Sequence, residues 1–313
     1  MYLKETNLVF NSYAKLNLYL EVLNRRKDNY HNIKTVFERI SLSDKIILKP
    51  RKDKSIKIIS KDPSLPKDDS NLCYLSARLL QESLHTRRGV DIEIIKRIPI
   101  GAGLGGGSSN AAAVLLGLNK LWELNLSQNS LVRLAKRIGC DVPFFIYNTS
   151  FAQAQERGDR VRPLGMLKKV RLWHIMVVPK IKVSTPLIYK KWDAYSGLTP
   201  PFFTSQSYKK NKRAGLTKPG YNVRILNLAL RKNDLSLIGK ALFNDLERIT
   251  TKLYPEVKRI KKRLADLGLG AILMSGSGPA VFAIVSSGKE AVSLSRQLKQ
   301  EGRPWRIYVA RTF

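Results

Sequence analysis

A glycine-dense segment between a strand pattern and a helix pattern limits the folds open to this chain. Five of the seven residues from 101 to 107 are glycine: Gly101, Gly103, Gly105, Gly106 and Gly107. Glycine lets a backbone approach a ligand closely and adopt positive φ angles. The alanine-rich helical pattern that begins near Ser108 or Ser109 would add unpaired N–H groups and a partial positive charge. The segment therefore predicts a phosphate-binding loop in preference to a turn without a ligand.

Three well-known classes of phosphate loop do not fit this segment. A Walker loop ends in GK[ST], whereas GSSN follows here, so the phosphate-binding lysine is missing. Gly101, Gly103 and Gly106 spell GxGxxG, but Glu123, the acid at the spacing of a dinucleotide fold, lies in a helical pattern rather than after a second strand. A protein kinase would also carry HRD and DFG, and neither string occurs.

Strand and helix patterns are intermixed along the whole chain. Alternating or β-branched runs predict strands at 16–22, 45–48, 56–60, 90–95, 171–178 and 280–285. Helical spacing predicts helices at 72–84, 109–124, 127–138, 222–230 and 253–267. The mixture predicts an α/β or α+β protein without internal repeats. Residues 163–169, which precede a new strand pattern, are the best candidate for a domain boundary.

The charge balance is strongly basic, with 56 Lys and Arg against 24 Asp and Glu and a formal net charge of +32. Such an excess favours association with polyanions without choosing among RNA, DNA, acidic membranes and phosphorylated metabolites. The basic residues lie in separate stretches at 45–61, 209–218 and 252–263. We therefore predict solvated faces of ordinary elements and no specific nucleic-acid partner. Residues 201–220 lack periodicity and predict a mobile basic loop.

The remaining composition predicts a cytoplasmic protein without a membrane partner. No uncharged apolar stretch approaches the roughly 20 residues needed to span a bilayer, and the first residues do not resemble a signal peptide. Cys73 and Cys140 stand in no CxxC pair or metal-ligand spacing, so we expect reduced thiols and assign no metal ligands. We expect Cys140 to be a packed thiol rather than a nucleophile.

Several motifs together resemble one enzyme family. The run PxxxGLGGGSS before an alanine-rich helix resembles the ATP loop of the GHMP small-molecule kinase superfamily. AKLNL, RRKDNYHNI, TVF, IGCDVPFF, STPLIY, NDLE and MSGSGPAVF occur in the order found in the 4-diphosphocytidyl-2-C-methyl-D-erythritol kinase family. The resemblance runs through almost the entire chain. It implies an ATP-dependent kinase that phosphorylates the 2-hydroxyl of this substrate in the non-mevalonate isoprenoid pathway.

The resemblance also implies an architecture and cofactors. It predicts a two-domain α+β GHMP kinase fold, with a ribosomal protein S5 domain 2-like N-terminal domain over residues 1–165 and a ferredoxin-like C-terminal domain over residues 166–313. The active site would lie in the cleft between them. ATP with Mg²⁺ would lie on the glycine loop, and residues 276–278 would approach from the other wall.

Site residues follow from the same resemblance, position by position. Asp141 would be the general base and Lys15 its cationic neighbour, which suits phosphoryl transfer because that chemistry needs orientation and charge stabilisation. The side chains implied around the cytidine diphosphate substrate are Asn17, Tyr30, His31, Thr185 and Tyr189. Of these, the Tyr189 ring would stack on cytosine and His31 would hydrogen-bond its polar edge. The ATP loop would comprise Pro99, Ile100, Gly101, Ala102, Gly103, Leu104, Gly105, Gly106, Gly107, Ser108 and Ser109.

The chain departs from the family pattern at three positions. Tyr13 replaces a proline, and Glu156 and Asp159 stand where the family more often has Gly and Glu. Two other functions remain open: a basic nucleic-acid-binding protein with a kinase-like fold, and a GHMP kinase for mevalonate or homoserine. Fold alone does not decide among them. The expected partner is a small-molecule substrate, and the expected state is a monomer or weak homodimer.

Overall fold

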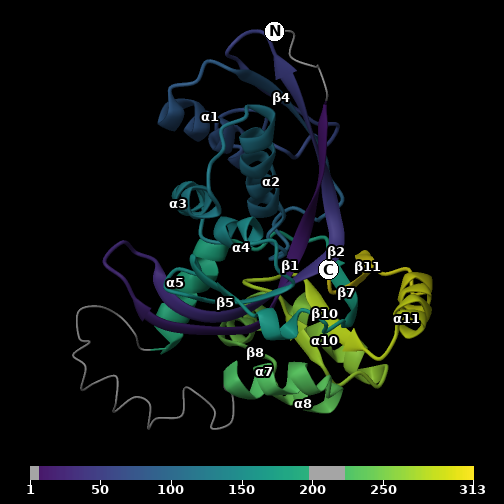
Figure 1. The fold of residues 1–313 in the computed structure, drawn as a ribbon. Coiled ribbons are helices and arrows are strands. Elements are labelled where there is room, and N and C mark those ends of the chain that lie inside the picture. The colour runs from purple at the N-terminus through teal and green to yellow at the C-terminus, as the bar shows by residue number, and fades with distance from the viewer. Residues whose placement is uncertain (1–6, 197–222) are drawn as a thin grey trace.

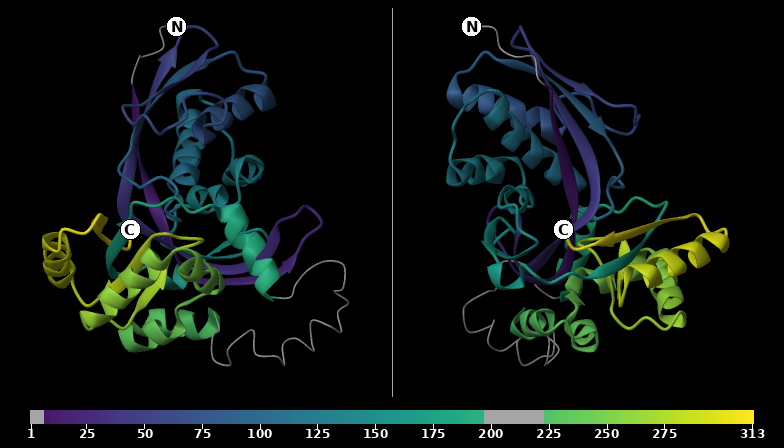
Figure 2. Two further views of the ribbon diagram at one scale, coloured as in Figure 1. Left: turned by 180° about the vertical axis from the view of Figure 1, so that it is seen from behind. Right: turned by 45° about the vertical axis from the view of Figure 1, so that its right-hand side comes forward.

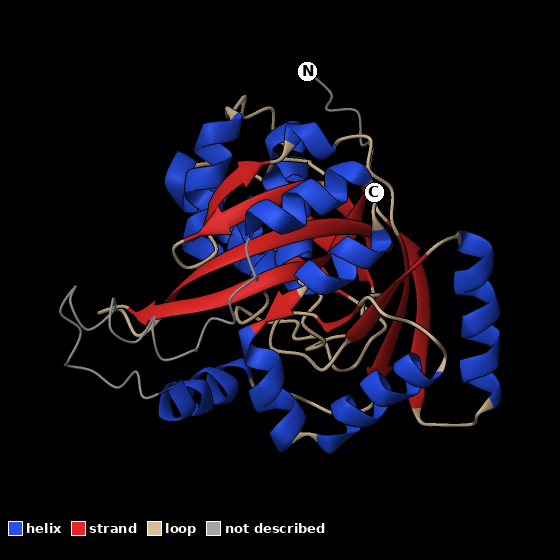
Figure 3. Cartoon of the chain, turned by 90° about the horizontal axis from the view of Figure 1, so that it is seen from below, coloured by secondary structure: helices blue, strands red, loops and turns tan. Residues whose placement is uncertain are grey.

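The computed structural model describes residues 7–196 and 223–313. Within these residues the strands form two sheets, and helices and strands are mixed as an α+β fold requires (Figure 1). The predicted mobile loop at 201–220 lies outside the described residues. Viewed from below, the strands of the two sheets run in different directions (Figure 3). No helix in the described part of the chain is long and apolar enough to cross a membrane.

The first sheet is built around one long antiparallel hairpin. Its strands are β1 (Leu8–Arg25), β2 (His31–Arg51), β3 (Ile56–Ile59), β4 (Gly89–Ile95), β5 (Phe151–Gln155), β6 (Arg160–Pro163) and β8 (Phe243–Asn244). Their order is β3-β4-β2-β1-β8, with β5 on β2 and β6 on β5. Register shifts between Tyr13 and Ala14 and between Asn17 and Tyr19 interrupt the pairing of β1 with β2. Such irregularities bend strands, so β2 can pair with β4 at one end and β5 at the other.

Four helices pack against this sheet. They are α1 (Leu72–Leu84), α2 (Gly106–Leu121), α3 (Gln128–Ile138) and α4 (Val142–Ile146). Figure 2 shows α1, α2 and α3 on one side of the long strands. The core between them contains Leu80, Val114, Leu48 and Ile92, all fully buried. The prediction of a helix at 72–84 is confirmed, and Asn71 caps it by accepting a hydrogen bond from the Cys73 N–H.

The second sheet has the order β11-β7-β10-β9 and is antiparallel throughout. Its strands are β7 (Trp173–Pro179), β9 (Ile272–Met274), β10 (Val281–Val285) and β11 (Trp305–Arg311). The helices of this half, after the short turn η1 (Gly165–Leu167), are α5 (Thr185–Ser196), α7 (Val223–Lys232), α8 (Leu235–Ala241), α9 (Asp245–Leu253), α10 (Pro255–Asp266) and α11 (Gly288–Gln300). With α10 before β9 and α11 before β11, the connectivity is ferredoxin-like, as predicted.

Both faces of β7 are covered, which explains its nearly continuous apolar run. Ile175 and Val177 share a core with α10 and α11. Met176 and Val178, which point the other way, share a core with α7, α8 and part of β1. Strand side chains alternate between faces, so a strand buried on both sides is apolar at most positions. The exception in β7 is the buried His174, whose imidazole is paired with Glu38.

Backbone pairing and buried side chains join the two halves of the chain. β8, from the C-terminal half, pairs in parallel with Tyr19 and Leu20 of β1. Ile40 bridges to Thr312. Glu38 and His174, both fully buried, meet across the junction with 2.8 Å between Oε1 and Nε2. The division near residue 165 therefore stays a proposal about chain organisation, because strands of one half complete the sheet of the other.

Two local predictions need correction. The helix after the glycine loop begins at Gly106 rather than at Ser108 or Ser109, because Gly105 adopts the left-handed conformation (φ 68°) at the N-cap. The short strand predicted at 45–48 is one part of the 21-residue β2. Its first half was missed because the Glu38, Arg39 and Asp44 side chains are polar yet buried through partners elsewhere in the fold.

We predict that His174→Ala lowers the free energy of unfolding by about 3–5 kcal/mol, because it leaves the Glu38 carboxylate buried without its imidazole partner. Urea unfolding of the purified variant would measure this. Arg78→Ala, which removes an exposed pair with Glu82 on α1, is the control and should leave the unfolding midpoint nearly unchanged. Equal midpoints for His174→Ala and the wild-type protein would contradict the prediction.

Candidate active site

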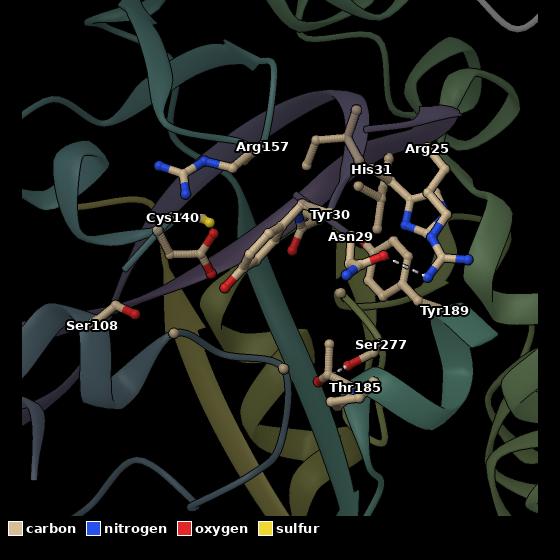
Figure 4. Close-up of a pocket in the computed structure, with 18 of the residues that line it drawn as sticks. Arg25, Asn29, Tyr30, His31, Ser108, Cys140, Arg157, Thr185, Tyr189 and Ser277 are labelled. Atoms are coloured by element: carbon tan, nitrogen blue, oxygen red, sulfur yellow. Dashed lines mark hydrogen bonds between the residues drawn. The ribbon is translucent and has the colours of Figure 1, made fainter. Parts of the chain in front are cut away.

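Two adjoining cavities share the glycine loop, and the larger of them lies where the two halves of the chain meet. The larger has a volume of about 870 Å³ and is lined by side chains from β1, β2, α5 and the 276–277 turn (Figure 4). The smaller, about 320 Å³, follows residues 99–108 and the start of α1. Gly103, Gly105 and Ser108 line both cavities. The glycine loop is therefore the wall that the two spaces share.

The glycine loop is held between β1 and the turn that joins β9 to β10. The Lys15 N–H donates to the Leu104 carbonyl (2.9 Å), and the Ser275 hydroxyl donates to the Gly103 carbonyl (3.0 Å). Gly103 has φ 77°, and a Cβ added there would lie 2.3 Å from the Ser275 carbonyl oxygen. Only glycine fits such a contact, because side chains rarely adopt this φ and the approach is closer than any real Cβ makes.

The smaller cavity suits the phosphates of a nucleotide. Besides residues 99–108, its lining includes Leu65, Asn71 and Lys96. It lies at the N-terminus of the 16-residue α2, where unpaired N–H groups favour anions. Ser108 faces this space, but the Ser109 side chain is 3% exposed and accepts a hydrogen bond from the Ser12 hydroxyl (2.7 Å). Of the two predicted hydroxyl ligands, Ser108 alone lines the cavities.

Lys15 and Asp141 meet at the boundary between the two cavities. Lys15 Nζ lies 3.3 Å from Asp141 Oδ2 and 2.5 Å from Asn17 Oδ1. The Lys15 side chain is 5% exposed, whereas that of Asp141 is 32% exposed. Lys15 is positioned by β1, and Asp141 directly precedes α4. The buried cation therefore holds a carboxylate that remains open to the larger cavity.

Asn17 is oriented by its own hydrogen bonds. Its Nδ2 donates to the Thr35 hydroxyl (2.8 Å), which donates to the Tyr19 carbonyl (2.6 Å). The amide oxygen of Asn17 is thereby directed at Lys15. Asn17 lines the larger cavity, as predicted, but its side chain also restrains the lysine.

The far end of the larger cavity is built on α5. His31 Nε2 lies 2.6 Å from Asp193 Oδ1, and the His31 ring stacks on Tyr189 with centroids 5.0 Å apart. Trp192 contacts the edge of the same imidazole. A carboxylate only accepts hydrogen bonds, so Nε2 carries the proton and Nδ1 is the nitrogen left for a ligand. Burial raises the pKa of the Tyr189 hydroxyl above its usual range.

The other predicted substrate residues line the same space. Tyr30 is 52% exposed and projects into the cavity between the Cys140 end and Tyr189 (Figure 4). The Thr185 hydroxyl hydrogen-bonds that of Ser277 (2.7 Å), which brings α5 against the turn after β9. The residues named from the sequence for catalysis and for the substrate thus surround one cavity, although they span positions 15 to 189.

Cys140 and Asp245 also have raised pKa values. Burial raises the pKa of the Cys140 thiol to about 11, which fits the interpretation of a packed thiol because the thiolate is the nucleophilic form. Burial also raises the pKa of Asp245 to about 7. Asp245 accepts a hydrogen bond from the Val22 N–H (2.7 Å) and lines neither cavity, so we assign it no chemical role.

Sequence reasoning missed several side chains that line the larger cavity: Arg25, Asp28, Asn29, Arg157, Lys190 and Asp193. Asp193 had a usable signal, because it follows Tyr189 by four residues and such positions share a helix face. Lys190 also lies on α5 and Arg25 ends β1, whereas the others come from turns, whose shape follows from tertiary packing. Glu156, one of the departures from the family pattern, adopts a positive φ of 58°, as a position that favours glycine would.

Comparison with known sequences supports one family. Residues 71–149 match the family described as GHMP kinases N terminal domain, and residues 226–304 match GHMP kinases C terminal. The 4-diphosphocytidyl-2-C-methyl-D-erythritol kinase of Geobacillus sp. (strain WCH70) is 40% identical over 87% of this chain and 86% of that protein. The kinase of that name from Thermosynechococcus vestitus is 37% identical over 92% of this chain and 90% of that protein. The chain belongs to this kinase family.

Solved structures agree with this assignment. The crystal structure of a 4-(cytidine 5'-diphospho)-2C-methyl-D-erythritol kinase superposes with a TM-score of 0.75 at 32% identity, covering 97% of this chain and 98% of that one. The mevalonate kinase of L. major superposes with a TM-score of 0.73 at 16% identity, which shows the fold alone. The family resemblance and the two-domain GHMP kinase fold predicted from the motifs are confirmed.

We predict that Gly103→Ala destabilises the protein more than Gly101→Ala. Both positions have positive φ, which costs a non-glycine residue about 1–2 kcal/mol. At Gly101 an added Cβ meets nothing within 4 Å, whereas at Gly103 it meets the Ser275 carbonyl, adding about 1–3 kcal/mol or more. Urea unfolding of the two variants checks this, and equal losses would refute the close contact.

We predict that Asp193→Asn raises the KM for the cytidine substrate about tenfold, the effect of losing roughly 1.4 kcal/mol from a charged hydrogen bond. Asparagine can donate its own N–H to Nε2, so the proton of the His31 imidazole is no longer held on that nitrogen. The KM for ATP serves as the internal control and should stay constant. An unchanged KM for the cytidine substrate would remove Asp193 from substrate binding.

Proposed function

We propose that this chain transfers the γ-phosphate of ATP to the 2-hydroxyl of 4-diphosphocytidyl-2-C-methyl-D-erythritol, the compound named in its relatives. Membership of the family makes it a GHMP kinase, a class that uses ATP as phosphate donor. The observation that carries the proposal is the position of Lys15 and Asp141. They lie where the glycine-loop cavity meets the cavity lined by Tyr30, His31 and Tyr189.

Asp141 is proposed to act on the attacking hydroxyl. Its carboxylate is open to the cavity and can accept a hydrogen bond from that hydroxyl, orienting the oxygen and taking up its proton. Lys15 is nearly buried, so its charge is only weakly screened at the reaction centre. The N-terminus of α2 adds N–H groups on the other side of the transferring phosphoryl group. Phosphoryl transfer depends mainly on such positioning and charge stabilisation.

Mg²⁺ is proposed to enter with ATP. Among the described residues, no group of three His, Cys, Asp or Glu side chains could hold a metal ion. Mg²⁺ commonly relies on substrate phosphates, waters and one or two protein oxygens. Ser108, which lines both cavities, is the side chain we propose for that role. When bound, the ion would neutralise charge on the phosphate oxygens.

The cytidine end of the substrate is proposed to lie against Tyr30 and Tyr189. Aromatic rings stack on any base, so recognition of cytosine is proposed to depend on the His31 nitrogen that Asp193 leaves available. Asn17 and Thr185 would complete the substrate contacts. The chain is further proposed to act in the cytoplasm as a monomer or weak homodimer, without a specific nucleic-acid or membrane partner.

We expect Asp141→Asn to lower kcat by about two to four decades, the usual contribution of a positioned acid–base group. Folding and ATP binding should change little, because the amide has nearly the same shape. A coupled assay of ADP release with the cytidine-diphospho substrate and Mg²⁺ measures turnover, and mass spectrometry identifies the phosphorylated product. Asp266→Asn, at the exposed end of α10, is the control. Near-wild-type turnover by Asp141→Asn would exclude Asp141 as the base.

A further inference from the structure

We propose that Arg157 binds the diphosphate of the substrate and so determines that the enzyme takes a nucleoside diphosphate derivative. This inference rests on the proposed function, because it uses the positions proposed for the two ends of the substrate. Arg157 belongs to the turn between β5 and β6 and lines the larger cavity. Neither the motifs nor the names of the relatives assign it a role.

The position of Arg157 is the first support. A nucleoside diphosphate substrate with its base at Tyr30 and its hydroxyl at Asp141 must place its diphosphate between those two side chains. The Arg157 guanidinium lies 5.4 Å from the centroid of the Tyr30 ring. The next residue, Gly158, is close enough to Asp141 that an added Cβ would lie 4.0 Å from Oδ1. The turn thus spans from the base end to the reaction centre.

Figure 4 shows the side chains of this arrangement. Arg157 lies above Cys140, on the side of Tyr30 away from Tyr189. Cys140 directly precedes Asp141 in the sequence. A phosphate group placed over the Cys140 end would therefore face the Arg157 guanidinium while the nucleoside reached toward Tyr189.

The second support is the way the arginine is held. Nε and Nη2 both donate to Asp159 Oδ2, at 3.1 and 2.6 Å, and Asp159 is 4% exposed. Among the described residues, Nη1 has no protein acceptor. A guanidinium fixed on one edge and open on another is prepared to bind phosphate oxygens with little loss of side-chain freedom. The hydrogen bonds to Asp159 also raise the pKa of Arg157, which keeps it charged.

The third support is the position and the pairing of the other positively charged side chains in this cavity. The basic side chains that line the described part of the larger cavity are Lys15, Arg25, Arg157 and Lys190. Lys15 is engaged by Asp141 and Asn17. Arg25 donates to Asn29 and lies 3.8 Å from Asp193, near the cytosine end. Lys190 is an exposed residue beside Tyr189 on α5. Arg157 is therefore the cation best placed for the middle of the substrate, and Lys190 is the competitor to test.

The experiment compares CDP with cytidine as probes of the larger cavity. Isothermal titration calorimetry would be run with a non-hydrolysable ATP analogue present, so that the smaller cavity is occupied. The wild-type protein should bind CDP more tightly than cytidine. Arg157→Gln should weaken the affinity for CDP about tenfold and leave the affinity for cytidine within about twofold of the wild-type value. The reason is that charge-assisted hydrogen bonds to phosphate are lost while the contacts to the base remain. Arg157→Lys, which keeps the positive charge but loses the planar guanidinium group, should bind CDP with an affinity between those of the wild-type protein and Arg157→Gln.

Steady-state kinetics provide an independent readout. Arg157→Gln should raise the KM for the cytidine-diphospho substrate with kcat nearly unchanged, because the diphosphate is bound alike in the ground and transition states. Arg160→Gln, in the same segment but 70% exposed and paired with Glu156, is the matched control for general loss of positive charge. Arg160→Gln should change neither the affinities for CDP and cytidine nor the KM for the cytidine-diphospho substrate. Thermal unfolding of each variant checks that the turn still folds.

The outcomes separate this inference from the proposed function. Absence of turnover by the wild-type protein would refute the function, whereas turnover with an unchanged KM in Arg157→Gln would overturn only the inference. Equal affinity of the wild-type protein for CDP and cytidine would also overturn it, even if no variant folded. A tenfold loss of CDP binding in Lys190→Gln but not in Arg157→Gln would move the diphosphate site to α5 and contradict the assignment.

Discussion

The contact between Gly103 and Ser275 brings the two halves of the chain into one site. The glycine loop follows a strand of the first sheet, and Ser275 begins the turn after β9 in the second sheet. The backbones approach so closely that no side chain fits between them. This contact sets the position of the start of α2, and through the Leu104 carbonyl it also positions Lys15 on β1. The N-terminal end of α2, proposed to bind phosphate, and the Lys15–Asp141 pair, proposed to be catalytic, therefore share one rigid support.

The β1–β2 hairpin then sets the distance between the two ends of the larger cavity. Lys15 and Asn17 lie in the middle of β1, and His31 lies where β2 begins. Because the paired β1–β2 hairpin carries all three residues, the spacing between the proposed reaction centre and the proposed base site follows from the strands and their register shifts rather than from loop conformation. The α5 helix and the β5–β6 turn supply the other walls.

Much of the site could be predicted from the sequence, since its motifs are contiguous. The glycine loop, Lys15, Asp141 and the Tyr30–His31 pair each lie in a short local pattern. Arg157 was missed because its importance depends on which side chains lie across the cavity, and no spacing rule encodes that. Asp193 was missed although its position four residues after Tyr189 was a usable signal. The burial of Ser109 depends likewise on Ser12 of β1. In the fold, α1 was predictable from its periodicity, whereas β8 has two residues and exists only because β1 offers it an edge.

That pairing of β8 with β1 has a consequence for the synthesis of the chain on the ribosome. Residues 243 and 244 emerge long after the first sheet has its other strands, so the edge of β1 at Tyr19 and Leu20 stays unpaired through most of translation. Open strand edges are templates for association with other chains. A fragment cut at the boundary near residue 165 would keep this edge permanently exposed. Nascent chains on crowded polysomes would be vulnerable to aggregation at the same strand that carries Lys15, the lysine proposed to be catalytic.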